Sequence, residues 1–329
     1  MSEKLLTISV AAYNVEKYLE NSLRHLEIPE WLEKLEVYII DDGGKDGSLS
    51  IAQKYKEKYP NTFHAIHKDN GGYGSTVAYS IEHATGKFFK LLDGDDWFDE
   101  KGLVKILELL ENCSEDVVIT DYFVGPDDNS LSIVSCHHND GDIEHVKDYR
   151  TSIPHGMWAL FYRTKILKES GIEFPLNTLY TDQLYATIPF AYAEDIRFYQ
   201  IPVYCYRYGR DEQSTSRKSR IKHIEEMLKV CSALYEFYDQ HKEDNNQYLL
   251  CRVARYYLGA IRTMLLLPPS TENRRMIVEY ENTHQKDYRE LYYAAERGTS
   301  IAIYIKMLRK THYRLYWTVK LIPEKYINF

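Results

Sequence analysis

Three carboxylates follow a short apolar run in the stretch KFFKLLDGDDW, residues 87–97. The run is bounded by glycines, which favours a buried strand over a helix. Asp93, Asp95 and Asp96 then lie at the carboxyl end of that strand, where Gly94 lets the backbone turn. Asp93 and Asp95 can therefore face one small cation. Hard cations such as Mg²⁺ and Mn²⁺ take oxygen ligands, often carboxylates together with substrate phosphates.

A second acidic pair, Asp41 and Asp42, ends another apolar run, LEVYIID at residues 35–41. Either acidic group also fits a simpler interpretation, a solvated turn that caps the next helix, because short acidic patterns often occur without a ligand. The elements around them decide between the two.

The first half of the chain alternates strand and helix patterns. Besides the run before Asp93, strands are predicted at residues 5–12, 35–41, 63–68 and 117–123. Helices are predicted between them, with Asn14, Asp46 or Ser48, Ser75 and Asp99 as capping residues. This alternation indicates βαβ units and a largely parallel sheet, whose strands end at one ligand-binding edge. Both acidic groups are expected at that edge.

The pattern changes after residue 124. Residues 124–154 indicate a loop with short strands, and His137, His138 and His145 lack a ligand framework, so a surface loop is favoured over a metal site. Helices are predicted near 163–170 and 181–193, a strand pair at 196–208, and helices at 221–241, 245–266, 272–295 and 299–321. We therefore predict a first domain at 1–218, with halves at about 1–125 and 126–218, and a helical region at 219–329.

Composition narrows the class of protein. The chain has 329 residues, of which 44% are hydrophobic, enough for one large core or two smaller ones. It has no apolar stretch of the length that spans a membrane and begins MSEKLLTISV, which predicts a strand rather than a signal peptide. Five cysteines without CxxC spacing suit reduced thiols and a cytoplasmic protein. A net charge of −8 argues against nucleic-acid partners.

Three common motifs are absent from the sequence. It has no GxxxxGK[ST] phosphate loop, no GxGxxG after the first strand and no GxSxG nucleophile turn. A nucleotide-binding site of the P-loop or dinucleotide type is therefore not expected, nor is an α/β-hydrolase.

The ordered motifs resemble one family, the family 2 glycosyltransferases. In chain order the matching stretches are ISVAAYNVEKYLENSLRHL, IIDDGGKDGS, KDNGGYGS, ATGKFFKLLDGDDW, Tyr180-Thr181-Asp182-Gln183 and PVYCYRYGRDEQSTS. Together they cover roughly residues 5–216. The resemblance implies an α/β protein with the GT-A fold, a Rossmann-like mixed sheet, and a C-terminal helical extension. It also implies a role in bacterial surface-glycan synthesis.

The resemblance assigns roles to particular residues. Asp95 would be the direct ligand of Mn²⁺ or Mg²⁺, with Asp93 supporting the metal or the ribose. Asp42, with Asp41 second, would hold the nucleoside, while Tyr13 packs against the base. The donor-binding set as a whole is Ala11, Ala12, Tyr13, Asp41, Asp42, Asn70, Gly71, Gly72, Asp93, Gly94, Arg207 and Ser214. His155 and Trp158 would lie on the acceptor side.

The sequence departs from the commonest family pattern in three places. Ala11-Ala12 stands where a proline is frequent, and Thr76-Val77-Ala78 replaces Ala-Arg-Asn, so another group must neutralise the donor there. The acidic doublet keeps only Asp182, to which the resemblance gives the role of catalytic base. His155 is the second candidate for the base, because histidine titrates near neutral pH.

The expected activity is metal-dependent, inverting transfer of a sugar, most simply from a UDP-sugar, to a hydroxyl of a glycan or lipid-linked oligosaccharide. A sugar-nucleotide pyrophosphorylase is one alternative, but ISVAAYN lacks the glycine-rich and basic loop expected there. A catalytically silent GT-A scaffold that binds glycan or partner enzymes is the other. Oligomeric state is left open.

The last predicted helix, residues 299–321, is basic and amphipathic. Ile301, Ile305, Leu308, Leu315 and Val319 lie near one stripe, with lysines, arginines and aromatic residues close by. Such a helix suits the anionic inner face of the plasma membrane, as a peripheral contact, or packing on its own chain.

Overall fold

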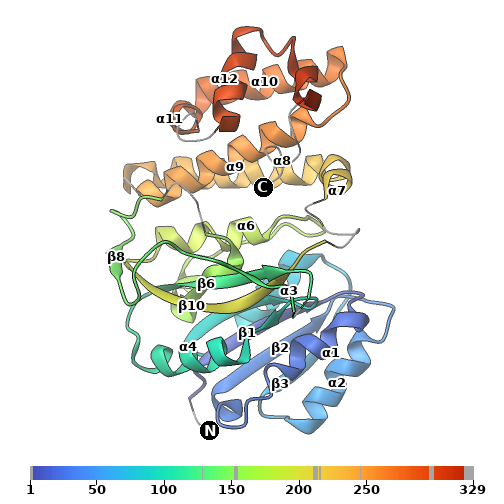
Figure 1. The fold of residues 1–329 in the computed structure, drawn as a ribbon, viewed down its shortest axis with the longest axis vertical. Helices are drawn as coiled ribbons and strands as arrows, with labels where there is room; N and C mark the ends of the chain where they lie inside the picture. The colour runs from blue at the N-terminus through green and yellow to red at the C-terminus, as the bar shows by residue number, and fades with distance from the viewer. Residues whose placement is uncertain are drawn as a thin grey trace. The chain divides into compact units, whose positions relative to one another are not determined.

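The chain forms two compact units, Met1–Val146 with His155–Arg210, and Lys147–Pro154 with Asp211–Phe329. The computed structural model describes residues 3–127, 129–151, 155–209, 214, 216–244, 246–295 and 300–321 (Figure 1). The first unit holds a sheet flanked by helices, and the second is helical. The predicted α/β class and helical C-terminal region are confirmed. The functional domains at 1–218 and 219–329 stay a prediction.

One mixed sheet carries the first unit. Within the described residues it has ten strands, in the order β3-β2-β1-β4-β9-β6-β10-β5, with β7 on β6 and β8 on β10. The strands are β1 (Leu6–Ala12), β2 (Leu35–Asp41), β3 (Phe63–His67), β4 (Phe88–Asp93), β5 (Trp97–Phe98), β6 (Val117–Gly125), β7 (Ser132–Val134), β8 (Ile143–His145), β9 (Leu160–Arg163) and β10 (Asp195–Arg207). β1, β2 and β4 are parallel and buried, as near-continuous apolar runs predict.

Helices and 3₁₀ turns connect these strands. They are α1 (Glu16–Arg24), η1 (Leu32–Lys34), α2 (Ser48–Lys58), α3 (Tyr73–His83), α4 (Glu100–Asn112), η2 (Met157–Ala159), α5 (Thr164–Glu169), α6 (Asp182–Tyr185) and η3 (Ile188–Ala191). Asp99 caps α4 as predicted, since its side chain accepts from the Gly102 N–H. Asn14 does not cap α1: its φ is 54°, and its side chain accepts from the Lys45 N–H instead. Ser75 lies inside α3, which begins at Tyr73.

One strand prediction was wrong, and one strand was missed. Residues 196–208 form one strand, β10, rather than a pair, because a register shift between Tyr199 and Tyr204 lets it continue along β6. β9 was not predicted. It is only four residues long, and it lies between β4 and β6, pairing antiparallel with both.

The second unit contains α7 (Arg217–Lys222), α8 (Ile224–His241), η4 (Lys242–Asp244), α9 (Gln247–Leu265), α10 (Thr271–Asp287), α11 (Arg289–Ala294), α12 (Ser300–Lys310) and η5 (Tyr316–Leu321). The predicted helix 272–295 is interrupted at Tyr288. The predicted helix 299–321 is also wrong as one piece, since α12 ends at Lys310 and the backbone φ is positive at His312 and Tyr313. Residue 299 lies outside the described residues.

A buried lysine fixes the segment that leads into β9. Lys90, in the middle of β4, is fully buried, and its Nζ donates to the carbonyls of Met157 at 3.0 Å, Trp158 at 2.6 Å and Leu160 at 3.1 Å. The ammonium group also lies 4.5 Å from the centre of the Phe161 ring. Burial lowers the pKa of Lys90 well below its usual range. Three carbonyls match the three hydrogens of the ammonium group and offset part of the free-energy cost of burying its charge.

We predict that Lys90→Met lowers the free energy of unfolding by about 3 kcal/mol, because three carbonyls inside the fold lose their donor. Urea unfolding of the purified protein measures this loss. Lys87→Met is the matched control, since the half-buried Lys87 donates to the carbonyls of Leu110 and Glu111 nearer the surface. Equal losses in the two variants would contradict the anchoring role of Lys90.

Candidate active site

The register of β1 brings the two acidic groups to one edge. Ala12 pairs with Asp41 of β2, and Ala11 pairs with Asp93 of β4. The carbonyl of Ala11 also accepts from the Gly94 N–H at 3.1 Å, which holds the acidic turn against β1. Tyr13 follows immediately, with 51% of its surface exposed. An exposed tyrosine therefore follows the strand end that pairs with both acidic groups.

The acidic turn groups three carboxylates. One oxygen from each of Asp93, Asp95 and Asp96 lies within 4.8 Å of the others. Asp96 is buried, accepting from the Tyr204 hydroxyl at 2.6 Å and from the Arg207 N–H at 2.8 Å. Burial, and then the charge of Asp93, raises the pKa of Asp96 well above its usual range. Asp96 therefore braces the turn, and Asp93 and Asp95 are the better-placed ligands for a cation.

Arg207 holds the same turn from β10. Its Nε donates to the carbonyl of Asp95 and its Nη1 to the carbonyl of Pro126, both at 3.0 Å. The guanidinium lies 4.5 Å from the centre of the Trp97 ring. These contacts place a cation beside the carboxylates. The role of Arg207 in donor binding stays a prediction.

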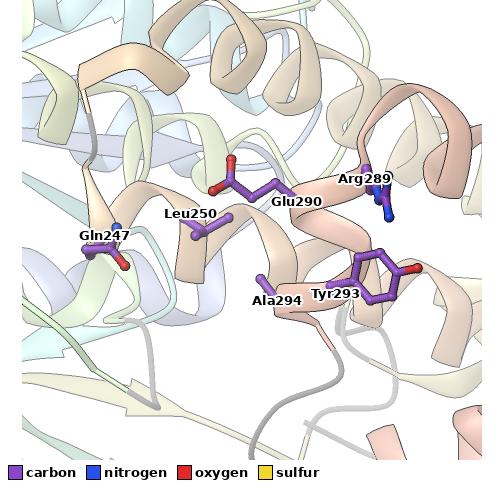
Figure 2. A pocket seen from close by; sticks show the side chains of 6 residues that line it. All are labelled: Gln247, Leu250, Arg289, Glu290, Tyr293 and Ala294. Atoms are coloured by element: carbon purple, nitrogen blue, oxygen red, sulfur yellow. The ribbon is translucent and has the colours of Figure 1, made fainter.

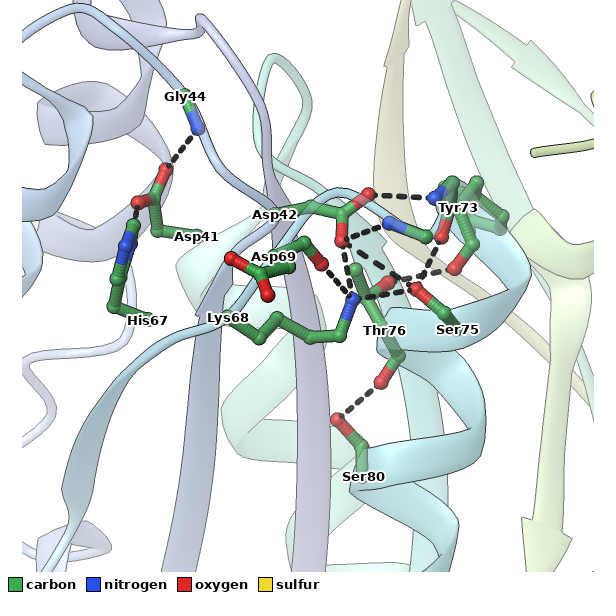
Figure 3. Close-up of polar contacts among 12 residues, drawn as sticks. Asp41, Asp42, Gly44, His67, Lys68, Asp69, Tyr73, Ser75, Thr76 and Ser80 are labelled. Atoms are coloured by element: carbon green, nitrogen blue, oxygen red, sulfur yellow. Dashed lines mark hydrogen bonds and ion pairs between the residues drawn. The ribbon is translucent and has the colours of Figure 1, made fainter. Parts of the chain in front are cut away.

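Asp42 organises the glycine-rich loop (Figure 3). It accepts from the N–H groups of Gly71 at 3.0 Å and Gly72 at 2.8 Å, from Lys68 Nζ at 2.5 Å and from the Ser75 hydroxyl at 3.4 Å. A carboxylate offers about four acceptor positions, and these donors use that capacity. Asp42 thus shapes the loop, and any contact between it and a nucleoside would have to displace one of these donors.

Asp41 has fewer donors among the described contacts. Its Oδ1 accepts from the Gly44 N–H at 3.1 Å, and its Oδ2 lies 2.6 Å from Nδ1 of His67, as Figure 3 shows. The His67 side chain is 55% exposed, whereas Asp41 is buried. Asn70, in the neighbouring loop, is exposed. Of the two acids, Asp41 keeps more acceptor capacity for a ligand.

Tyr73 connects the acidic turn to Asp182. It is the first residue of α3, and its hydroxyl lies 3.3 Å from the Met157 sulfur. Burial raises the pKa of Tyr73 well above its usual range, and the charges of Asp93 and Asp182 raise it further. Asp93 also hydrogen-bonds the Tyr73 side chain. Both carboxylates therefore act electrostatically on one hydroxyl group, although they are far apart in the sequence.

Backbone contacts fix the segment that carries Asp182. The Asn177 N–H donates to the Gly71 carbonyl at 2.8 Å, and a Cβ on Gly74 would meet Phe174 Cβ at 2.6 Å. The glycine loop and the segment before α6 therefore pack in close contact. Asp182 begins α6 and accepts from the Gln183 side chain at 2.7 Å.

The two predicted acceptor-side residues, Trp158 and His155, pack against different aromatic rings. Trp158 packs on Tyr206, with ring centres 4.6 Å apart, and on Tyr122 at 5.6 Å. His155 contacts the Phe198 ring at 6.4 Å. Phe198 lies six positions before Tyr204 on β10, so His155 contacts a part of the strand away from the acidic turn. Ser214 is an exposed turn residue assigned to the second unit, and its role stays a prediction.

Sequence reasoning missed Lys68, Tyr73, Lys90 and Tyr204 as residues that build this edge. Lys90 carries a usable signal, a single cation inside an apolar strand. Lys68 and Tyr73 flank the glycine loop in the sequence, but their partners come from β2, β4 and α6. A local sequence pattern cannot identify partners that lie so far away in the chain.

A pocket of about 450 Å³ lies in the second unit (Figure 2). It is lined by Gln247, Leu250, Arg289, Glu290, Tyr293 and Ala294. None of the predicted site residues is among them. Glu290 accepts from the Tyr238 hydroxyl at 2.7 Å, so part of its charge serves helix packing.

Known proteins share both the sequence pattern and the fold. The model of glycosyl transferase family 2 matches residues 7–169. The putative glycosyltransferase EpsH of Bacillus subtilis is 27% identical over 215 residues, covering 63% of this chain and 62% of EpsH. The chain thus spans less than two thirds of the length of that relative.

Two solved structures share the architecture. Residues 1–349 of S. aureus TarS in complex with UDP-GlcNAc align with a TM-score of 0.56 and 20% identity, over 89% of this chain and 90% of that one. The mannosyltransferase PcManGT from Pyrobaculum calidifontis, in complex with GDP-Man and Mn²⁺, aligns with a TM-score of 0.50 and 17% identity, over 93% and 86%. At these identities the likeness shows the fold.

The predicted GT-A fold is confirmed by these structural neighbours and by the mixed sheet with its helical extension. The family model covers the strands and loops that carry Asp41, Asp42, Asp93 and Asp95. The sequence motifs and the family model agree over the first half of the chain, and the part that the model matches, residues 7–169, belongs to glycosyl transferase family 2.

Proposed function

We propose that the protein is a metal-dependent, inverting glycosyltransferase. It moves a hexosyl or N-acetylhexosaminyl group from a nucleotide diphosphate, most simply UDP, to a hydroxyl of a glycan or lipid-linked oligosaccharide. One observation carries the proposal: the Asp93 and Asp95 carboxylates lie within 4.8 Å of each other at the end of β4, and the charges of Asp93 and Asp182 both raise the pKa of the Tyr73 hydroxyl. These contacts support a cation site and a candidate base that share the half-buried Tyr73 as a neighbour.

The neighbours support a nucleotide-sugar donor. TarS was solved with UDP-GlcNAc, and PcManGT with GDP-Man and Mn²⁺. In this chain the base would lie against Tyr13, with Asp41 receiving hydrogen bonds from the nucleoside and Asn70, Gly71 and Gly72 bordering it. We assign the primary nucleoside role to Asp41, because the hydrogen bonds of Asp42 are used by the glycine loop.

The carboxylates suit a divalent ion by their chemistry. Oxygen atoms of Asp93 and Asp95 are the ligands that Mn²⁺ and Mg²⁺ prefer, and both residues are only half-buried. Bound there, the ion would stabilise charge on the diphosphate as it leaves. Arg207 and Lys68 supply positive charge at the same edge, where the family arginine is missing.

Asp182 is the proposed catalytic base. Attack by an alcohol requires that its proton be accepted in the transition state. Asp182 and Asp93 both influence Tyr73, but Asp182 belongs to α6 and Asp93 to β4. Asp93 can therefore help to bind the donor diphosphate while Asp182 accepts the proton of the acceptor hydroxyl. Gln183 orients the Asp182 carboxylate through its amide. His155, whose ring contacts Phe198, has weaker support.

Removing the metal ligand should stop transfer. We expect Asp95→Ala to reduce the initial rate of sugar transfer by at least about 10²-fold, because charge stabilisation of several kcal/mol is lost. Chelation with EDTA should do the same to the wild type, and Mn²⁺ should restore it. The matched control is Asp69→Ala, an exposed acid at the same edge of the sheet. Full activity of the wild type in EDTA would exclude the metal mechanism.

Replacing the base should separate chemistry from binding. Asp182→Asn should lower sugar transfer by about 10²–10⁴-fold, because the amide cannot accept the proton. Donor binding in the presence of Mn²⁺, followed by calorimetry, should stay nearly unchanged. His155→Ala is the comparison variant and should retain activity. A dead His155→Ala beside an active Asp182→Asn would transfer the role to His155. Wild-type protein that binds donor but never turns it over would indicate a silent scaffold.

A further inference from the structure

The C-terminal segment buries most of its predicted apolar stripe and exposes other apolar residues. Ile305, Leu308 and Val319, part of the predicted apolar stripe, are almost completely buried in the second unit, as are Tyr313 and Tyr316. Four large apolar side chains are exposed instead: Ile303 is 65% exposed, Met307 59%, and Trp317 and the stripe residue Leu315 47% each. Ile305, Leu308 and Val319 of the predicted stripe are therefore core, Leu315 is not, and the side chain of Ile301 lies outside the described residues; the exposed apolar residues remain to be explained.

These exposed residues belong to one local structure. α12 ends at Lys310, and the positive φ values of His312 and Tyr313 reverse the chain. The Tyr304 hydroxyl then lies 2.6 Å from the Thr318 hydroxyl, which ties η5 back to α12. Ile303 and Trp317 are the sequence neighbours of these two tied residues. The contact therefore brings together the backbone segments that carry one exposed apolar residue each, Ile303 on α12 and Trp317 on the segment after it.

The formal charge of the segment itself has one sign. Residues 300–321 contain no aspartate or glutamate, although the chain as a whole has a net charge of −8. Arg309 pairs with the buried Glu281 inside the unit, but Lys306, Lys310 and Arg314 are exposed. On α12, Ile303, Lys306, Met307 and Lys310 follow helical i, i+3, i+4, i+7 spacing, so basic and apolar side chains share one face.

We propose that this surface, Ile303, Lys306, Met307, Lys310, Arg314, Leu315 and Trp317, docks the protein on an anionic lipid bilayer. Apolar side chains enter the interface, lysine and arginine meet lipid phosphates, and tryptophan prefers the headgroup level. A protein partner would need acidic groups of its own to match this surface, whereas the bilayer supplies them continuously. The inference deepens the proposed function, since a lipid-linked acceptor lies at such a surface. Its evidence comes from the second unit alone.

Among the residues that the structure describes, no helix is both long and apolar enough to cross a membrane. Docking would thus be a surface contact made by a few side chains. Such contacts depend on salt, because exposed charges are screened within about 10 Å at 0.1 M ionic strength. Salt dependence is therefore a direct test of the charged part of the surface.

Vesicle flotation of the full chain tests the proposal. We expect the protein to float with vesicles of phosphatidylglycerol and phosphatidylcholine at low salt, and not with phosphatidylcholine alone. The emission of Trp317 should shift to the blue on the anionic vesicles, and Trp317→Tyr should remove that shift. Lys310→Gln with Arg314→Gln should weaken binding by about tenfold. Met307→Gln should weaken it further at every salt concentration.

Ile133→Gln is the matched control, an equally exposed apolar residue of the first unit (60%), and should bind as the wild type does. All variants should keep the wild-type thermal midpoint and donor turnover, because they change exposed residues that are not part of the candidate active site. No flotation with anionic vesicles would overturn the proposal, as would self-association in sedimentation that Met307→Gln removes, which would assign the surface to a second copy. Neither result would affect sugar transfer, so the two proposals fail separately.

Discussion

The parallel register of β1 between β2 and β4 is the constraint on which the site depends. It sets Asp41 opposite Ala12 and Asp93 opposite Ala11, so two acids from distant parts of the chain flank a single strand end. Sheet hydrogen bonds between buried apolar strands hold this register rigidly, because a slip of one residue would turn every side chain to the other face. The loops after these strands can then carry polar groups without having to hold the sheet together.

The aspartates at this edge fall into two sets: those whose oxygens are saturated by hydrogen bonds inside the protein, and those that are half-buried and can bind a ligand. The carboxylate oxygens of Asp42 and Asp96 accept hydrogen bonds from backbone N–H groups and from Lys68, Ser75 or Tyr204. Such saturated carboxylates pre-organise a loop, which lowers the entropy lost when a ligand binds. Asp93 and Asp95 stay only half-buried. Neighbouring residues of one motif therefore do different physical tasks, which their identity as aspartates does not reveal.

An ion pair and a hydrogen bond within the second unit explain which side of α12 packs inward. Arg309 of α12 pairs with Glu281 of α10, and Tyr257 of α9 hydrogen-bonds the same carboxylate. A pair of charges this deeply buried is costly unless both partners are present, so the contact selects one orientation of α12. The residues that pack inward with Arg309 are Ile305 and Leu308. Ile303 and Met307 therefore lie on the exposed side of α12.

The sequence by itself determined the alternation of strands and helices, the strand ends that carry both acidic groups, and the Asp99 cap, because burial period and capping are encoded within a few residues. Only the tertiary structure decided that β9 enters the sheet, that β10 continues past its bulge, and that Tyr73 lies beside Asp93 and Asp182. It also decided which side of α12 faces water. Each of these rests on a partner far away in the chain, and an amphipathic pattern specifies that a face is apolar without specifying what will cover it.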